Sequence, residues 1–275
     1  MTTTTAPRTG YAPVNGLNMY YEIHGEGQPL LLLHGAFSAI GTSFSKLLPG
    51  LVEGRQVIGV ELQAHGRTAD IDRPLDLDLL AEDTAVFLQY LNIEQADIFG
   101  YSNGAAVALR LAVGHPNLVR KQVLASIGYK LDGIYPELLA GLGQMKPEMM
   151  HGSPWHDEYL RLAPDPDHFP TLFAKKTEMD RNAKNVPDEA IRAITAPTLL
   201  VIGDSDIVRP EHIVEFFRLL GGGVIGDLAG LPIHQLAILP GTTHVTVADR
   251  VDLLVPMIKA FLDAPMPETK VTQAH

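Results

Sequence analysis

The chain has 275 residues, 46% of them apolar, and a formal net charge of −11 at pH 7. This length and composition predict one large α/β domain with a sizeable core and room for an inserted segment. The negative charge argues against nucleic acid and anionic membranes as partners. The chain contains no cysteine, which excludes disulfides, cysteine–zinc sites and a thiol nucleophile.

The first residues, Met1 to Pro7, are polar and lack the apolar segment of a secretory signal. No apolar run approaches the length that spans a membrane. We therefore expect a cytoplasmic protein that does not act at a membrane.

Short apolar runs alternate with longer runs of helical periodicity, which is typical of a mostly parallel sheet flanked by helices. The predicted strands are 19–23, 30–33, 56–60, 96–99, 122–125, 198–202 and 235–239. The predicted helices are 77–91, 102–113, 211–220 and 249–262. Because Leu30 to Leu33 are all apolar, we expect that strand to be covered on both faces.

The segment from Tyr129 to Asn185 interrupts this alternation, because it contains many prolines and no clear strand. Its methionines and aromatic residues are typical of an adaptable apolar wall over a binding pocket. We interpret residues 129–185 as a helical cap over the catalytic end of the sheet. Residues 1–128 and 186–275 would then form the core domain. An irregular surface insertion without a functional role is the alternative interpretation.

The strongest functional signal is the pentapeptide from Gly100 to Gly104, which reads Gly-Tyr-Ser-Asn-Gly directly after a predicted strand. A helix of small residues follows it. This context is typical of a nucleophile elbow, in which a tight, strained turn exposes the serine at the start of a helix. The two glycines avoid collisions of Cβ atoms with the adjacent strand and helix. We therefore predict that Ser102 is a catalytic nucleophile.

A serine nucleophile needs a histidine base and a carboxylate that orients this base. In the order serine, acid, histidine, the acid follows a late strand and the histidine follows the last one. Among the histidines, His244 alone has that position. Two acids, Asp204 and Asp206, follow the strand at 198–202. We favour Asp206 because it lies further into the loop, whereas Asp204 is placed to cap the turn.

Two main-chain N–H groups should stabilise the oxyanion of the reaction. We predict Asn103, which follows the nucleophile, as one donor. Ala36, in the loop after the strand at 30–33, is the predicted second donor, and Phe37 is the alternative. We also predict that Phe37, Tyr101 and Trp155 contact the substrate.

Taken together, these motifs resemble the α/β-hydrolase superfamily over nearly the whole chain. The matching segments are His34-Gly35, 63–68, the elbow at Ser102, Gly203-x-x-Asp206 and Gly241-x-x-His244. The resemblance implies an α/β-hydrolase fold with a mostly parallel central sheet, flanking helices and an inserted helical cap. It also implies that the carboxylate three residues after Gly203 is the acid of the triad, which supports Asp206.

Four polar residues near these motifs receive structural interpretations. We expect His34 to hold the oxyanion loop by hydrogen bonds. Glu61 stands where many members of the superfamily have aspartate, and we interpret Glu61, His65 and Arg67 as a structural turn near the site.

The resemblance implies acyl transfer to water through an acyl-serine intermediate, with no metal or organic cofactor. Residues 221–232 further resemble a bacterial subgroup of esterases, some of which open the lactone ring of N-acyl homoserine lactones. We therefore expect a small-molecule ester or lactone as the substrate. The metal-lactonase pattern His-x-His-x-Asp-His is absent, so lactone opening would depend on Ser102.

Three alternatives stay open. Haloalkane dehalogenases and epoxide hydrolases use aspartate as the nucleophile, which argues against them, but cofactor-free perhydrolases share the triad. C–C bond hydrolases have a longer glycine-rich oxyanion loop than residues 34–37, which makes that alternative weaker. A ligand receptor of the same fold would bind its ligand without turnover.

Overall fold

The computed structural model describes residues 6–142 and 144–267. An eight-stranded sheet forms its centre, in the order β1-β2-β4-β3-β5-β6-β7-β8. The strands are β1 (Arg8–Val14), β2 (Leu17–His24), β3 (Gln28–Leu33), β4 (Arg55–Val60), β5 (Ala96–Tyr101), β6 (Val119–Ala125), β7 (Thr198–Ser205) and β8 (Gln235–Thr243). The pairs β1–β2 and β2–β4 are antiparallel, and all other pairs are parallel. The predicted mostly parallel sheet is confirmed.

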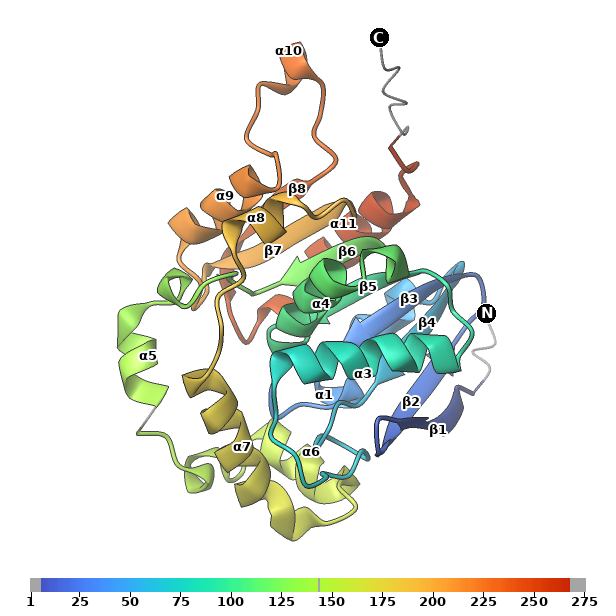
Figure 1. Cartoon of the computed structure of the whole chain (residues 1–275), viewed down its shortest axis with the longest axis vertical. Coiled ribbons are helices and arrows are strands. Elements are labelled where there is room, and N and C mark those ends of the chain that lie inside the picture. The colour runs from blue at the N-terminus through green and yellow to red at the C-terminus, as the bar shows by residue number, and fades with distance from the viewer. Residues whose placement is uncertain (1–5, 143, 268–275) are drawn as a thin grey trace.

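Helices cover both faces of this sheet (Figure 1). One face packs against α3 (Leu77–Tyr90), α4 (Asn103–Gly114) and α9 (Pro210–Leu219). The other packs against α1 (Ile40–Phe44), α2 (Leu48–Leu51) and α11 (Val251–Asp263). The four predicted helices are present as α3, α4, α9 and α11, whereas α1 and α2 are too short for their periodicity to be recognised.

The apolar run in β3 contributes side chains to the hydrophobic core on both faces of the sheet. Leu31 and Leu33 belong to the core cluster beneath α3, α4 and α9. Leu30 and Leu32 belong to the opposite cluster, beneath α1, α2 and α11. Successive side chains of a strand point to opposite faces, so an unbroken apolar run fits a strand that is covered twice.

The first strand, β1, was not expected from the sequence. It pairs with β2 through a hairpin, in which Val14 lies opposite Leu17. The turn residues Asn15 and Gly16 both have positive φ, at 47° and 88°. An Asn-Gly pair is the residue combination that such a two-residue turn favours, and this was the signal for the hairpin.

The described residues between β6 and β7 form helical elements and no strand. These are η2 (Leu131–Gly133), α5 (Pro136–Leu142), η3 (Pro147–Met150), α6 (Pro154–Leu162), η4 (Pro166–His168), α7 (Phe169–Arg181) and α8 (Asp188–Arg192). Four of these elements begin with proline, which suits the first position of a helix because its missing N–H has no partner there. We call residues 129–185 the insert; its helices α5, α6 and α7 lie together on one side of the molecule (Figure 1).

A second irregular segment, residues 221–234, projects from the body with α10 (Gly226–Ala229) at its tip (Figure 1). Leu228 and Leu231 are strongly exposed there. Two short turns, η1 (Pro116–Leu118) and η5 (Val247–Asp249), complete the described elements. Within residues 6–142 and 144–267, no helix combines the length and apolar character needed to cross a membrane.

Candidate active site

Ser102 lies in the turn between β5 and α4, where the Gly-x-Ser-x-Gly pattern predicts it. Its backbone has φ 53° and ψ −116°, a region that residues other than glycine rarely occupy. The Ser102 N–H donates to the carbonyl of Ala125 in β6 at 2.8 Å, so a contact with the neighbouring strand holds the strained turn. The serine therefore stands at the carboxyl edge of the sheet, beside the N-terminus of α4.

Gly100 and Gly104 make this turn sterically possible. A Cβ atom at position 100 would lie 2.5 Å from Cα of Ala105, and one at position 104 would lie 2.0 Å from the carbonyl oxygen of Leu33. Both neighbours are backbone atoms, so neither collision can be relieved by moving a side chain. The predicted reason for the two glycines is confirmed.

Ser102, His244 and Asp206 form one chain of hydrogen bonds, although they come from three different loops. Ser102 Oγ lies 2.9 Å from His244 Nε2, and His244 Nδ1 lies 2.8 Å from Asp206 Oδ1. Because an ionised carboxylate can only accept, Nδ1 carries the proton and Nε2 is left to accept from the serine hydroxyl. This is the arrangement that a serine nucleophile and its base require.

The Asp206 carboxylate is fully buried, yet its surroundings favour the ionised form. Burial by itself would raise its pKa, but hydrogen bonds from His244, Ser126 and the Gly203 N–H hold the pKa below its usual value. The Ser126 hydroxyl donates to Asp206 Oδ2 at 2.6 Å. Ser126 was not singled out in the sequence, but it directly follows the predicted strand at 122–125. A small polar residue at the carboxyl end of a strand was the available signal.

Asp204, the alternative acid, contacts the main chain of the histidine loop. Its carboxylate accepts from the N–H groups of Gly241 at 2.9 Å and Thr242 at 3.1 Å. These two hydrogen bonds lower the pKa of Asp204. Asp206 therefore contacts the imidazole of His244, whereas Asp204 supports the loop that carries this histidine.

Main-chain N–H groups are available on both sides of Ser102. Asn103 is the first residue of α4, where an N–H has no acceptor within the helix. The N–H groups of Ala36 and Phe37 donate to no described residue, and all three residues line the same cavity as Ser102. Asn103 and either Ala36 or Phe37 can therefore serve as the predicted pair of oxyanion donors.

The cavity beside Ser102 has a volume of about 320 Å³, within the range of small-molecule sites. Ser102 and His244 contribute to its wall. Its apolar wall comes mainly from the insert and neighbouring loops: Phe37, Leu131, Ile134, Leu138, Leu139, Met145 and Ile207. Among the described residues, no cluster of three or more His, Asp or Glu side chains is arranged to hold a metal.

The three residues predicted to contact the substrate lie in different places. Phe37 lines the cavity and stacks on Phe173 of α7, with ring centroids 5.4 Å apart. The Tyr101 hydroxyl donates to the main-chain carbonyl of His244 at 2.7 Å. Trp155 lies in α6, and neither Tyr101 nor Trp155 is among the described residues that line the cavity. Substrate contact by these two residues stays a prediction.

His34 ties together the loops that follow β3 and β4. Its Nδ1 donates to the Gly35 carbonyl at 2.8 Å, and its Nε2 accepts from the Leu62 N–H at 3.0 Å. Burial lowers the pKa of His34 to about 4, so the imidazole is neutral near pH 7. His34 therefore holds the loop after β3 by hydrogen bonds, as expected.

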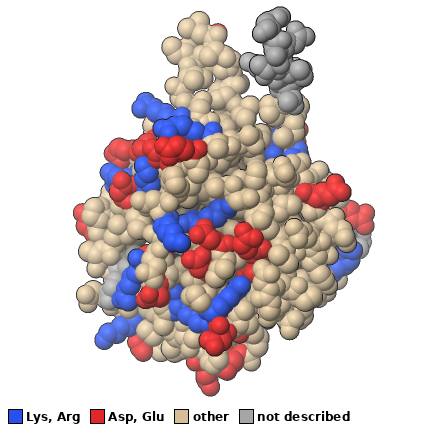
Figure 2. Space-filling model, in the orientation of Figure 1, with Lys and Arg blue, Asp and Glu red and all other residues tan. Residues whose placement is uncertain are grey.

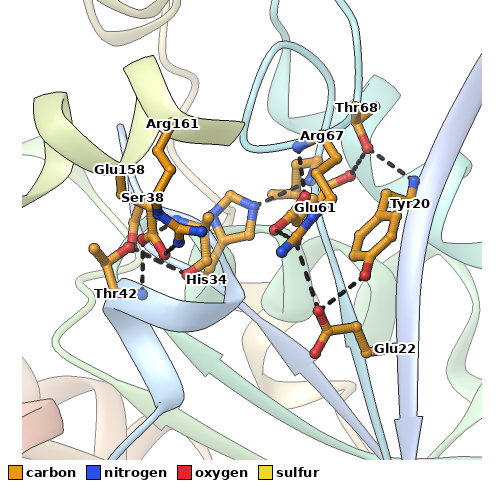
Figure 3. A network of polar contacts seen from close by, with 12 residues as sticks. Tyr20, Glu22, His34, Ser38, Thr42, Glu61, Arg67, Thr68, Glu158 and Arg161 are labelled. Atoms are coloured by element: carbon orange, nitrogen blue, oxygen red, sulfur yellow. Dashed lines mark hydrogen bonds and ion pairs between the residues drawn. The ribbon is translucent and has the colours of Figure 1, made fainter. Parts of the chain in front are cut away.

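The turn after β4 is held by a buried carboxylate (Figure 3). Glu61 accepts from the Arg67 N–H at 2.5 Å and from the Arg67 guanidinium at 2.8 Å. Burial raises the pKa of Glu61 to about 7, and Arg67 opposes this rise. His65 Nδ1 donates to the Gln63 carbonyl at 2.8 Å. Glu61, His65 and Arg67 therefore form the structural turn that was expected.

The insert is linked to the oxyanion loop by a chain of polar contacts (Figure 3). Glu158 of α6 accepts from the Thr42 N–H of α1 at 2.8 Å. The Thr42 hydroxyl lies 2.6 Å from that of Ser38, and the Ser38 hydroxyl lies 2.7 Å from that of Ser43. Ser43 Oγ in turn accepts from the Gly35 N–H at 3.3 Å. Glu158 thus reaches the start of the oxyanion loop through three hydroxyl side chains.

Comparison with known proteins shows the family of the chain. A family model for the alpha/beta hydrolase fold matches residues 28–187. A putative carbamate hydrolase, RutD, from Azorhizobium caulinodans is 24% identical over 268 residues, which cover 91% of this chain and 97% of the relative. A pimeloyl-[acyl-carrier protein] methyl ester esterase from Neisseria meningitidis serogroup B is 30% identical over 217 residues, which cover 70% of this chain and 81% of the relative.

The chain spans 41% of the length of one curated relative that it matches and 97% of the length of another. Among solved structures, the enol-lactonase from Burkholderia xenovorans LB400 superimposes with a TM-score of 0.71 at 18% identity. That comparison covers 92% of this chain and all of the other. This structural likeness supports the fold alone. The family model spans more than half of the chain, and the chain therefore belongs to the α/β hydrolase family.

Proposed function

We propose that this protein hydrolyses carboxylic esters, lactones included, through an acyl-serine intermediate on Ser102. The observation that carries this proposal is the chain of hydrogen bonds from Ser102 through His244 to buried Asp206. A relative with a methyl ester as its named substrate also supports it. The proposed partner is a small-molecule ester or lactone.

The first half of the reaction acylates the serine. His244 Nε2 takes the proton of Ser102 Oγ as the oxygen attacks the ester carbonyl carbon. The N–H groups of Asn103 and of Ala36 or Phe37 stabilise the oxyanion. The ester C–O bond then breaks, and the leaving alcohol takes its proton from His244. Asp206 stays ionised and stabilises the imidazolium.

The second half releases the acid. His244 takes a proton from water, whose oxygen attacks the acyl carbon, and the Ser102–acyl bond breaks. The proton returns to Ser102 Oγ. In a lactone the leaving alcohol is part of the same molecule, so the product is a single hydroxy acid.

We also propose that the insert acts as a cap over this site. Leu138 and Met145 of the insert line the cavity that contains Ser102. Phe173 of α7 stacks on Phe37 of the oxyanion loop. A cap in this position would limit water near the reacting atoms and so strengthen electrostatic stabilisation of the oxyanion.

The test measures hydrolysis of short and medium-chain p-nitrophenyl esters and of N-acyl homoserine lactones. Wild type is compared with Ser102→Ala, His244→Ala and, as a control, Ser45→Ala at an exposed serine outside the cavity. Each catalytic variant should lose at least about 10³-fold in kcat, while its circular dichroism and thermal unfolding match wild type.

The substrate pattern separates the outcomes. Serine-dependent opening of lactones at a kcat/KM near that of the esters assigns lactones as substrates. Turnover of short esters only assigns a general esterase. Hydrolysis that survives in Ser102→Ala, or ligand binding without any serine-dependent turnover, contradicts the proposed function.

A further inference from the structure

Helix α7 carries a buried lysine within its apolar face. Phe169, Leu172, Phe173 and Met179 are buried at a spacing that places them on one side of the helix. Lys176 continues this spacing, three residues after Phe173 and three before Met179, and is only 8% exposed. Lysine is almost never fully buried unless it is paired. Its place among apolar residues therefore needs a specific explanation.

Lys176 lines the cavity that contains Ser102 and His244. Its Nζ donates to Asp180 Oδ1, one turn further along α7, at 2.5 Å. An ammonium has three N–H donors, and Asp180 supplies the only acceptor found within the described part of the chain. Two donors are thus available to oxygens of a bound molecule.

The pair with Asp180 is a weak reason to bury this ammonium. In a helix, a pair of opposite charges four residues apart is more favourable when the acid precedes the base, and here Lys176 precedes Asp180. The Asp180 side chain is also about one-third exposed, which allows water to compete for its carboxylate. A bound ligand that accepts the two remaining N–H groups of the ammonium would explain better why Lys176 is buried.

The lysine, arginine and carboxylate side chains of the cavity wall point to the charge of that ligand. The cationic ones are Arg110, Lys130, Lys176 and Lys184. Asp180 is the single carboxylate among the described lining residues. The whole chain has a net charge of −11, so the cavity reverses the sign of the protein around it.

Three of these cations have their partners outside the wall. Arg110 pairs with Asp78 at 3.0 Å, and Lys130 pairs with Asp188 at 2.7 Å. Lys184 also lies 4.0 Å from Asp78. Neither Asp78 nor Asp188 lines the cavity. In Figure 2, lysine and arginine side chains gather near the middle of the visible face, with acidic side chains beside them. Together the four cations pair with three carboxylates, Asp78, Asp180 and Asp188, which leaves one positive charge in excess around the cavity.

Resting on the proposed ester hydrolysis, we infer that the acyl part of the substrate carries a second carboxylate, which binds Lys176 while the ester carbonyl lies at Ser102. The substrate class is then the half-esters of dicarboxylic acids, or lactones that bear a carboxylate. Phe37, Leu138 and Leu139 of the same cavity contact the methylene groups between the two ends.

Matched substrates test this inference directly. Monomethyl succinate, glutarate and adipate carry a terminal carboxylate, and the corresponding methyl ester monoamides have the same shape without the charge. Wild type should show a kcat/KM about tenfold or more higher for one of the half-esters than for its monoamide, because a charge-assisted hydrogen bond replaces a neutral one. The best chain length reports the span from Ser102 to Lys176.

Two variants assign this preference to Lys176. Lys176→Met, which suits an apolar helix face, should remove the preference for the half-ester. Asp180→Asn should increase it, because the competing carboxylate is gone. Lys146→Met serves as the control, because Lys146 is an exposed lysine of the insert outside the cavity lining, and should leave the preference unchanged.

Failure of this inference is distinguishable from failure of the proposed function. Serine-dependent hydrolysis of monoamides at rates equal to or above those of every half-ester overturns the carboxylate and leaves the esterase in place. An equal loss of preference in Lys176→Met and Lys146→Met also overturns it. If no substrate is hydrolysed, calorimetry measures the affinity of the Ser102→Ala variant for the half-ester and for the monoamide. Equal affinities overturn the inference.

Discussion

At the carboxyl edge of the sheet, Phe37, Ala64, Ser102 and Ser126 have positive φ, each in the loop after one of the strands β3 to β6. Six described non-glycine residues have positive φ, so most of them gather at this edge. Such a conformation costs about 1–3 kcal/mol and persists only where surrounding contacts enforce it. The strain is concentrated at the proposed nucleophile Ser102, at the loop after β3 and at Ser126, which contacts Asp206.

The amino edge of the same sheet is built from buried charges. Asp97 Oδ2 accepts from Arg55 at 3.1 Å and from Arg120 at 2.5 Å. Burial raises the pKa of Asp97, and both arginines oppose this rise. Lys121 donates to three main-chain carbonyls at the end of α11, those of Phe261, Leu262 and Ala264. These contacts join the sheet to the last helix.

The two edges of the sheet therefore differ in role. The amino edge contributes to the stability of the fold, and the carboxyl edge carries the residues that are proposed to react. Parallel strands present all of their carboxyl ends at one edge, so loops that carry reactive groups meet there. Buried charge pairs at the other edge anchor α11 far from the cavity. Changes at the carboxyl edge should therefore alter rates, and changes at the amino edge should alter stability.

The largest effect on rate is expected for Asp206→Asn. The amide can donate to His244 Nδ1, which places the imidazole proton on Nε2 and blocks acceptance from Ser102. We expect kcat to fall by about 10³- to 10⁴-fold. Asp204→Asn is the matched control in the same loop and should cost far less activity. Equal losses in the two variants would mean that the acid is assigned wrongly.

Acid should destabilise the carboxyl edge through His34. The unfolded chain binds a proton at this residue below about pH 6.5, whereas the buried imidazole resists protonation until about pH 4. The unfolded state therefore binds more protons in this window, and stability falls as pH falls. The loss from this residue is about 3 kcal/mol between pH 7 and pH 4.

Urea unfolding of wild type and His34→Gln at pH 7, 5 and 4 measures this loss. The variant should be less stable at pH 7, because it loses a hydrogen bond of the native loop, but its stability should depend less steeply on pH. Parallel curves for the two proteins would show that His34 is not the group that titrates.

Lys121→Met probes the amino edge. It removes a buried ammonium and its hydrogen bonds to the Phe261 and Ala264 carbonyl groups, whereas the Leu262 carbonyl still accepts from Arg120. The loss should cost about 1–3 kcal/mol of unfolding free energy. The kcat/KM for p-nitrophenyl acetate should stay within about twofold of wild type, because the site is at the opposite edge. A variant of normal stability and poor activity would contradict the separation between the two edges.

The smallest effect is expected at Glu158, which acts through Thr42, Ser38 and Ser43 on the oxyanion loop. Glu158→Ala should lower kcat about three- to tenfold, with KM for a small ester little changed, because the donors are held less firmly. Glu158→Gln keeps an acceptor for the Thr42 N–H and should restore much of the loss. No recovery with glutamine would exclude this positioning role.

Local patterns were enough to predict the elbow, the strand and helix order, and His244. Each depends on neighbouring residues: two glycines around a serine, apolar runs of strand length, and a histidine just after the last run. The same local logic would also have found β1 from Asn15-Gly16. Three residues were missed: Ser126, Glu158 and Lys176. Ser126 and Glu158 contact residues that are distant in the sequence, and Lys176 is a charged residue on the apolar face of its helix.

By itself, the sequence determined the family, the strained serine and the positions of seven of the eight strands along the chain, because these follow from short motifs, local sterics and hydrophobic periodicity. The order of the strands within the sheet came from the tertiary structure. The tertiary structure showed the contact of His244 with Asp206, the acid that the sequence favoured. Only the tertiary structure set Ser126 beside that carboxylate and put a lysine of α7 into the wall of the cavity. Those facts depend on how loops and helices distant in the chain pack at one edge of the sheet, where burial and hydrogen-bond geometry decide which polar groups meet.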